Sequence, residues 1–367
     1  MATLGYRAEI DAGRRFLEKI EPSNTIVLFF HGDVDGCCSG AIMYRTLRYH
    51  GCHLTFPVFL EKGETIYSDS LAKRALVREP THLIVMDTGS RNQAILPGIT
   101  TMVIDHHKPE GVPPVDVYIT SFGVYPPEPS ALLTYNICQE ITPLNGLDWL
   151  AAVGTAGDMG INAKLEILRE AKSRYGVKTI KETVALVDAA RRSPSHDIAT
   201  AFSALVSADS PFDITEGIIP ESVILRQYRK MVSAEIRHAI KAVPKYSGKW
   251  AILQFSSPAL IHPIVAAEWS NRLNENIVIA ANYGYTESNV HFSIRTKINI
   301  NLHEEIMGIK PPDEEEEFVS DYSKASGGVL PIVDFIEFLR ILDFPKEVAE
   351  FIPIQAQGLK SEAIETC

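Results

Sequence analysis

The stretch VLFFHGDVDGCCSG, residues 27–40, joins a fully apolar run to a loop that carries one histidine and two aspartates. The apolar run is too hydrophobic for a half-exposed strand, which favours a buried parallel strand. Aspartate and glycine both favour turns, so an ordinary strand-ending turn is one interpretation of the loop. The other is a ligand-binding loop, and the rest of the chain bears on the choice.

Three further runs have the composition of strands, namely residues 54–59, 81–87 and 100–105. Pro57 lies within the first of them, which predicts a strand at the edge of a sheet. Residues 38–49 and 69–79 lie between these runs and are helical in composition. Strands that alternate with helices predict βαβ units and a parallel sheet, and therefore an α/β fold.

Histidine and aspartate residues gather where these apolar runs end. The carboxyl ends of strands in an open parallel sheet are where ligands bind. Unpaired buried carboxylates cost several kcal/mol each, so we expect a positive partner. No lysine or arginine lies among them, although Arg91 and Lys108 are close in sequence, and two divalent metal ions are the natural counter-charge. The residues are His31, Asp33 and Asp35 after the first run, Asp87 after the third, Asp105, His106 and His107 after the fourth, and Asp158 in a later helical segment with a tight glycine turn.

The chemical groups of the candidate ligands indicate which metal ions could bind. Imidazole and carboxylate groups without a thiolate suit Mn²⁺ or another mid-series divalent ion. Cys37 and Cys38 lie where the next helix should begin, and we interpret them as packing residues. Two ions about 3.5–4 Å apart could clamp a phosphate and generate hydroxide near neutral pH.

Four motifs in this order, HGDVDG, VMDTGS, VIDHHKP and GTAGDMG, resemble those of the DHH phosphoesterase superfamily. The two-residue spacing of the acids in the first motif is similar to the RecJ-like nuclease branch and its archaeal relatives. The resemblance implies a parallel-sheet DHH catalytic domain, a helical connector and a smaller α/β C-terminal domain that binds substrate. We expect these parts at residues 1–190, 191–245 and 246–367.

The resemblance also implies a role for each motif residue. Asp87 would bridge two metal ions, Asp105 would orient a histidine through its ring N–H, and His107 would contact the scissile phosphate or assist the leaving group. The remaining ligands would be His31 and Asp33 for one ion, and Asp35, His106 and Asp158 for the other.

The resemblance further implies a C-terminal domain that binds the nucleotide end through a Gly-Gly-His turn and an upstream arginine. ASGGVLP (325–331) occupies that place and is expected to form a glycine-rich turn that opens the last helix. Val329 stands where the family has histidine, which leaves the mode and polarity of substrate binding open. A simple helix-entry turn is the alternative. The predicted substrate-binding residues are Arg295, Ser326, Gly327 and Gly328.

The net charge of −11 argues against a protein that coats duplex nucleic acid. Residues 223–249 nevertheless hold seven lysines and arginines against one acid. This stretch is either a solvated helix face or a surface that follows a single-stranded backbone. The acidic run at residues 313–317 predicts a solvated loop.

We therefore expect a metal-dependent phosphodiesterase, foremost an exonuclease that hydrolyses single-stranded DNA or RNA with two Mn²⁺ ions, or with Mg²⁺. The first alternative is a phosphodiesterase for short oligonucleotides or cyclic dinucleotides. A non-catalytic replication or repair subunit ranks lower because all the ligands are present, and a pyrophosphatase also ranks lower because no match to its anion-binding pattern is evident.

The predicted setting is the cytoplasm. The five cysteines form no CxxC motif, and no apolar run approaches the roughly 20 residues that span a bilayer. We expect no membrane association. A protein partner in replication or DNA repair, and a homo-oligomer, stay open alternatives.

Overall fold

The computed structural model describes residues 7–142, 146–307, 318–322 and 324–353. The chain divides into two compact units: unit 1, Met1–Arg191 with Ser195–Arg229, and unit 2, Arg192–Pro194 with Lys230–Cys367. The division into three parts that the sequence suggested stays a prediction. The acidic run at residues 313–317 lies outside the described residues.

Unit 1 is built on sheet A, five parallel strands in the order β2-β1-β3-β4-β5. The sheet confirms the predicted α/β fold with a parallel sheet, and β2, which ends at Pro57, lies at its edge as expected. The fifth strand was not predicted. The strands are β1 (Ile26–Phe30), β2 (Thr55–Pro57), β3 (His82–Met86), β4 (Thr100–Asp105) and β5 (Val117–Thr120).

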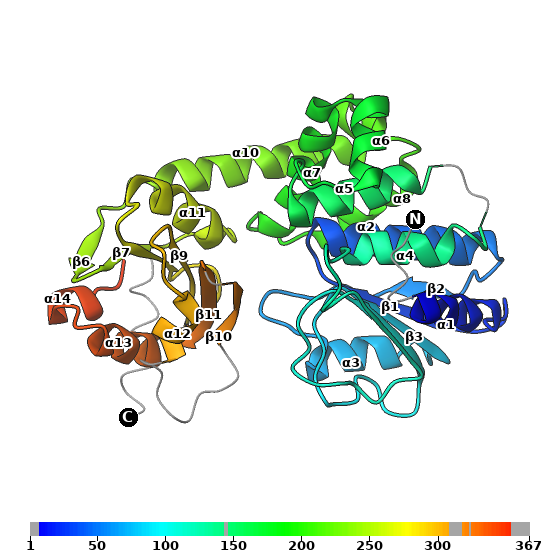
Figure 1. The fold of residues 1–367 in the computed structure, drawn as a ribbon, viewed down its shortest axis with the longest axis horizontal. Coiled ribbons are helices and arrows are strands. Elements are labelled where there is room, and N and C mark those ends of the chain that lie inside the picture. Colours follow the sequence, from blue (N-terminus) through cyan, green and yellow to red (C-terminus); the bar gives the residue numbers. More distant parts are fainter. Residues whose placement is uncertain (1–6, 143–145, 308–317, 323, 354–367) are drawn as a thin grey trace. The chain divides into compact units, whose positions relative to one another are not determined.

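Helices cover both faces of sheet A (Figure 1). On one face, Ile26, Leu28 and Phe30 of β1 share a core with α2 (Val34–Tyr49), α4 (Ser130–Cys138) and α5 (Asp148–Met159). On the other face, alternate residues of β1 pack against α3 (Asp69–Leu76). Burying one such apolar side chain contributes about 1.5–3 kcal/mol, so this central strand is firmly held.

In the described part of the chain, six further helices lie wholly or partly in unit 1. Residues 166–175 and 177–192 are helical, and the helix from 221 onward contains the boundary between the two units. No helix in the described part of the chain is long and apolar enough to cross a membrane. These helices are α1 (Arg7–Glu18), α6 (Glu166–Tyr175), α7 (Val177–Arg192), α8 (Ile198–Ser207), α9 (Pro211–Thr215) and α10 (Glu221–Ala239).

The first glycine of the motif GTAGDMG has a packing role inside α5, where the sequence suggested a tight turn. A Cβ on Gly154 would lie 2.4 Å from Cβ of Ala131 and 2.9 Å from Oδ1 of Asp35. Glycine therefore lets α5 approach α2 and α4 closely. Asp158 lies one turn further along α5, next to its last residue, Met159.

Unit 2 contains sheet B, six strands in the order β10-β11-β9-β8-β7-β6. Strands β7 and β8 are parallel, and the other neighbours are antiparallel. The elements are β6 (Lys245–Ser247), β7 (Trp250–Phe255), α11 (His262–Arg272), β8 (Ile277–Asn282), β9 (Asn289–Thr296), α12 (Leu302–Met307), β10 (Phe318–Tyr322), β11 (Ala325–Pro331), α13 (Ile332–Ile341) and α14 (Lys346–Ala349).

The expectation of a glycine-rich turn at residues 325–331 is wrong. These residues form β11, which pairs with β9 along its whole length before α13 begins at Ile332. A Cβ on Gly327 would lie 2.6 Å from the carbonyl oxygen of Phe292 on β9. The glycine therefore allows two strands to approach, which is a known use of glycine inside strands.

Candidate metal centre

The candidate centre lies at the carboxyl edge of sheet A, where the connectivity reverses. From β1 the chain passes to β2 on one side, and from β3 it continues to β4 and β5 on the other. Ligands bind at such switch points in open α/β sheets. The neighbouring strands β1, β3 and β4 end next to His31, Asp87 and His106.

Asp87 lies between two groups of candidate ligands. Its Oδ2 is 3.8 Å from Nδ1 of His31, and its Oδ1 is 3.3 Å from Nε2 of His106 and 3.8 Å from Nδ1 of His107. Its φ of 62° is left-handed, which aspartate tolerates better than most residues. Two sets of ligand atoms could each hold an ion, and Asp87 belongs to both: His31, Asp33 and Asp87, and Asp87, His106 and His107.

The first group is fixed by the start of α2. Asp33 caps this helix, accepting a hydrogen bond at Oδ1 from the N–H of Gly36 at 3.0 Å. Its Oδ2 lies 2.8 Å from Nδ1 of His31. Burial alone would raise the pKa of Asp33, but the charge and hydrogen bond of His31, together with the charge of Arg191, lower it well below its usual range.

The second group draws on α4 and α5. Asp35 accepts hydrogen bonds from the backbone N–H groups of Ser130 (2.8 Å) and Ala131 (3.0 Å), at the first turn of α4. His106 has Asp35 at 4.0 Å from its Nε2 and Asp158 at 3.9 Å from its Nδ1. The structure therefore brings all six predicted metal ligands together, and it also brings His107 beside Asp87.

Asp105 organises the two histidines that follow it. Its Oδ1 accepts hydrogen bonds from the N–H groups of His106 (2.8 Å) and His107 (3.2 Å), and it lies 2.7 Å from Nδ1 of His107. Burial lowers the pKa of His107, but the hydrogen bond to Asp105 and the charge of Asp87 outweigh it and raise this pKa to about 9. In the metal-free chain this pKa favours a protonated His107 at neutral pH, and the ring is half exposed.

The residues present fit a pair of divalent ions. Burial, followed by neighbouring negative charge, raises the pKa of Asp35 and Asp87 well above the usual range, and burial also raises the pKa of Asp158. Oδ2 of Asp105 is buried without a hydrogen-bond partner among the described residues. Carboxylates packed this closely are stable as anions only beside positive charge, and this donor set suits mid-series divalent ions.

Two contacts of the centre were not predicted. The guanidinium of Arg191, at the end of α7, lies 2.7 Å from Nε2 of His31, although 160 residues separate them. Ser130 donates a hydrogen bond from Oγ to Oδ1 of Asp87 at 3.0 Å. Ser130 is the first residue of α4 and follows Pro129, a sequence that is typical of a helix start. It does not indicate the contact with Asp87. No local pattern marks Arg191.

The predicted substrate-binding residues belong to unit 2. Arg295 on β9 donates to the carbonyl oxygens of Ile294 (2.9 Å) and Ser326 (3.2 Å), and among the described residues it has no carboxylate partner. Oγ of Ser326 is buried without a hydrogen-bond partner among these residues. Gly327 and Gly328 lie within β11. Tyr283 and Tyr285, which follow β8, are buried.

Comparison with known proteins agrees with this architecture. Residues 25–152 match the sequence model described as DHH family, N-terminal domain. No curated protein matches the chain significantly.

Three solved structures are similar to almost the whole chain. Exonuclease RecJ bound to manganese is 17% identical, with a TM-score of 0.60 over 96% of this chain and 98% of that one. RecJ from Thermus thermophilus in complex with Mn²⁺ is 17% identical, with a TM-score of 0.65 over 96% of this chain, which spans 56% of that RecJ chain. The DHH domain of a protein assigned to a family of ribosomal proteins is 15% identical, with a TM-score of 0.65 over 95% of this chain and 92% of that one.

At these identities the structural similarity establishes the fold. The sequence match covers the segment that supplies His31, Asp33, Asp35, Asp87 and the histidines after Asp105. Residues 25–152 therefore match the N-terminal domain of the DHH family, and the chain has a RecJ-like fold.

Proposed function

We propose that the chain is a metal-dependent exonuclease that hydrolyses single-stranded DNA or RNA with two divalent ions, Mn²⁺ or Mg²⁺. The observation that carries this proposal is Asp87, whose two carboxylate oxygens face two different groups of ligands. A pair of divalent ions supplies transition-state charge stabilisation and lowers the pKa of an attacking water. His31, Asp33, Asp35, His106 and Asp158 would hold these ions together with Asp87.

The residues around the ions have separate tasks in this proposal. Asp105 orients His107 through Nδ1, so that Nε2 of the protonated ring is available to the substrate. The His107 ring, held at Nδ1 by Asp105, can donate a hydrogen bond to the scissile phosphate and pass a proton to the leaving oxygen. Ser130 holds the Asp87 carboxylate from the side of α4, which keeps its two oxygens directed at the two groups of ligands.

A phosphodiesterase for short oligonucleotides or cyclic dinucleotides is the second candidate, because part of the predicted basic face is already used. Arg226 donates to the carbonyl oxygen of Thr215 at 2.6 Å, and Arg229 pairs with Glu182. Lys230 and Arg237 are exposed. A shorter basic surface would follow fewer phosphates of a long strand.

The test is an assay of the full chain with Mn²⁺ or Mg²⁺ on labelled single strands, duplexes, dinucleotides and cyclic dinucleotides. We expect stepwise shortening of single strands, with Mn²⁺ at least as effective as Mg²⁺. Cleavage confined to dinucleotides or cyclic dinucleotides would select the second candidate. Full hydrolysis in EDTA would contradict a metal-dependent mechanism.

A further inference from the structure

The loop that joins β5 to α4, residues 121–129, is hydrogen-bonded to residues of the candidate metal centre at both of its ends. At its start, the N–H of Ser121 donates to the carbonyl oxygen of Asp105 at 3.3 Å. Directly after its end, Ser130 donates from Oγ to Oδ1 of Asp87 at 3.0 Å. Strand β5 also pairs with β4, which ends at Asp105. The β5–α4 loop therefore borders the candidate metal centre within unit 1.

The backbone of this loop is fixed by its own contacts. The N–H of Val124 donates to the carbonyl oxygen of Ser121 at 3.0 Å, and Gly123 has the positive φ of 82° that the third residue of such a turn requires. Oγ of Ser121 donates to the carbonyl oxygen of Glu128 at 2.7 Å, and Val124 packs against the core of unit 1. Three prolines within residues 126–129 restrict the chain further. A ligand that binds this loop therefore has little loop entropy to remove.

The fixed loop exposes two aromatic side chains. Tyr125 is 91% exposed and Phe122 is 47% exposed. Among the described residues of unit 1, the other largely exposed aromatic side chain is Tyr49, near the end of α2. One exposed apolar side chain is ordinary, whereas two aromatic rings close together on a rigid loop indicate a surface that a ligand covers.

The chemistry of the loop favours a flat apolar ligand over a phosphate. Residues 121–129 contain no lysine or arginine. Their one carboxylate, Glu128, accepts a hydrogen bond from Asn136 of α4 at 2.9 Å. Every base of a nucleic acid has an apolar face, and proteins commonly hold single strands by stacking such bases on aromatic side chains. The occupant that suits this loop is therefore a base of a single strand.

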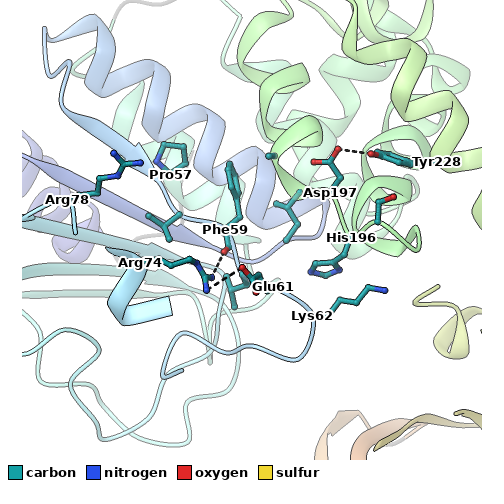
Figure 2. A pocket seen from close by; sticks show the side chains of 14 residues that line it. Pro57, Phe59, Glu61, Lys62, Arg74, Arg78, His196, Asp197 and Tyr228 are labelled. Atoms are coloured by element: carbon teal, nitrogen blue, oxygen red, sulfur yellow. Dashed lines mark hydrogen bonds and ion pairs between the residues drawn. The ribbon is translucent and has the colours of Figure 1, made fainter. Parts of the chain in front are cut away.

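The opposite side of the centre offers no comparable rings. A groove of about 800 Å³ lies where β2 ends, and β2 is at the other edge of sheet A from β5 (Figure 2). Of its aromatic side chains, Phe59 packs edge-on against Phe30 and Phe202. Tyr228 donates a hydrogen bond to Asp197 at 2.7 Å. Both rings thus stabilise the fold, and the largely exposed rings near the centre, among the described residues, are those of the β5–α4 loop.

We propose that Tyr125 and Phe122 stack on bases of the single strand close to the scissile phosphate. The inference rests on the proposed function and deepens it, because it names residues that position the strand. Tyr125 comes four residues after Ser121. An extended chain spans at most about 3.6 Å per residue, so Tyr125 lies within about 14 Å of the end of β5 at the centre. The stacked bases therefore belong to the first few nucleotides from the cleaved bond.

The experiment places a fluorescent base at each position of a short single strand in turn. The base is 2-aminopurine, whose fluorescence is quenched when it stacks on an aromatic ring, so the position that responds identifies the stacked nucleotide. Binding to the full chain is measured with Ca²⁺, so that stacking is recorded whether or not cleavage occurs. We expect the wild type to quench one or two adjacent positions near one end of the strand.

Variants of the two rings and a matched control test the assignment. Tyr125→Ala should remove the quenching at one position and weaken binding by roughly five- to 100-fold, the usual range for a lost stacked base. Tyr125→Phe keeps the ring and should retain both, and Phe122→Ala should have a smaller effect because its ring is about half exposed. Tyr49→Ala removes an exposed tyrosine at the far end of α2, a helix about 24 Å long, and should behave as the wild type.

Salt dependence and an abasic strand separate stacking from phosphate contact. Stacking neutralises no phosphate, so the affinity of Tyr125→Ala should fall with salt as steeply as that of the wild type. A strand without a base at the responding position should bind equally to the wild type and to Tyr125→Ala. A shallower salt dependence in Tyr125→Ala, or a weaker affinity of this variant for the abasic strand, would contradict stacking.

The outcomes also separate this inference from the proposed function. Quenching that depends on Tyr125 without any cleavage in Mn²⁺ keeps the stacking site and contradicts the exonuclease. Cleavage of single strands without quenching at any position, or with quenching that is unchanged in Tyr125→Ala and Phe122→Ala, overturns the stacking site and leaves the exonuclease in place. Absence of binding to every single strand contradicts both.

Discussion

The carboxyl edge of sheet A and the β9–β11 pair of sheet B bury charged groups of opposite sign. At the first, buried carboxylates crowd around Asp87, and their pKa values are mostly raised. At the second, Arg295 is largely buried with only main-chain carbonyls as partners among the described residues, and burial lowers its pKa. The first region is suited to bind cations and the second to bind an anion, which agrees with the metal-dependent phosphodiesterase proposed above.

The largest expected effect is at Asp87. Asp87→Ala should reduce activity to background, by roughly 10³-fold or more, because its carboxylate faces both groups of ligands. His107→Ala should cost about 10²–10⁴-fold through loss of the proton donor, with the metal content retained. Activity assays and metal analysis of both purified variants test this. An equal loss of metal in the two variants would contradict the roles assigned to them.

The second prediction concerns Arg295 of sheet B, which has no carboxylate partner among the described residues. Arg295→Ala should raise KM by roughly tenfold, and Arg295→Lys by less, because a lysine keeps the charge but not the fork of donors. Lys297→Ala is the matched control, since Lys297 is exposed just beyond β9 and should leave KM unchanged. Steady-state kinetics on one single-stranded substrate decide it. A KM that is unchanged in Arg295→Ala would remove this residue from the substrate site.

The third prediction is a pH dependence of metal-induced stability. Carboxyl groups ionise near pH 4 in an unfolded chain, whereas Asp35, Asp87 and Asp158 keep their protons to higher pH in the metal-free fold. The metal-free chain should therefore lose stability as pH rises above about 4. Divalent ions bind the deprotonated groups, so Mn²⁺ should raise Tm more at pH 7.5 than at pH 5.5. Differential scanning calorimetry with and without Mn²⁺ measures this, and equal gains at both pH values would contradict it.

The smallest expected effect is on α10, outside both regions. Lys230→Glu combined with Arg237→Glu should weaken cleavage of a long strand a few-fold and reduce its salt dependence by about 0.7 per charge. Both side chains are exposed, and Arg229 is left intact because it pairs with Glu182. Cleavage of a dinucleotide is the internal control. A variant that matches the wild type on long strands at every salt concentration would show that this face is only solvated.

The same comparison explains what could be predicted from the sequence. The candidate metal centre is assembled from short motifs, three of them directly after an apolar strand and the fourth in α5, so its residues could be identified without knowing how the strands pair. The parallel sheet then brought these motifs together, as strand-end positions require. The contact between Asp105 and His107 is also local, since only His106 separates them in the chain.

The parts that escaped prediction depend on contacts distant in sequence. Arg191 reaches His31 from a helix 160 residues away. Gly154 looked like a turn residue, but its lack of a Cβ serves packing against Ala131. Gly327 was likewise expected in a turn, one that opens the last helix. It lies in a strand instead, because residues 325–331 pair with β9. Glycine marks a close approach of two segments, and the sequence alone does not identify the second segment.

The most direct test of the central claim is the number of Mn²⁺ ions that the full chain binds and whether they interact. Calorimetric titration should give two ions per chain, and electron paramagnetic resonance of the loaded protein should show exchange coupling between them, because Asp87 faces both groups of ligands. In Asp87→Ala the coupling should disappear. One ion per chain, or two uncoupled ions in the wild type, would contradict a bridged two-metal centre.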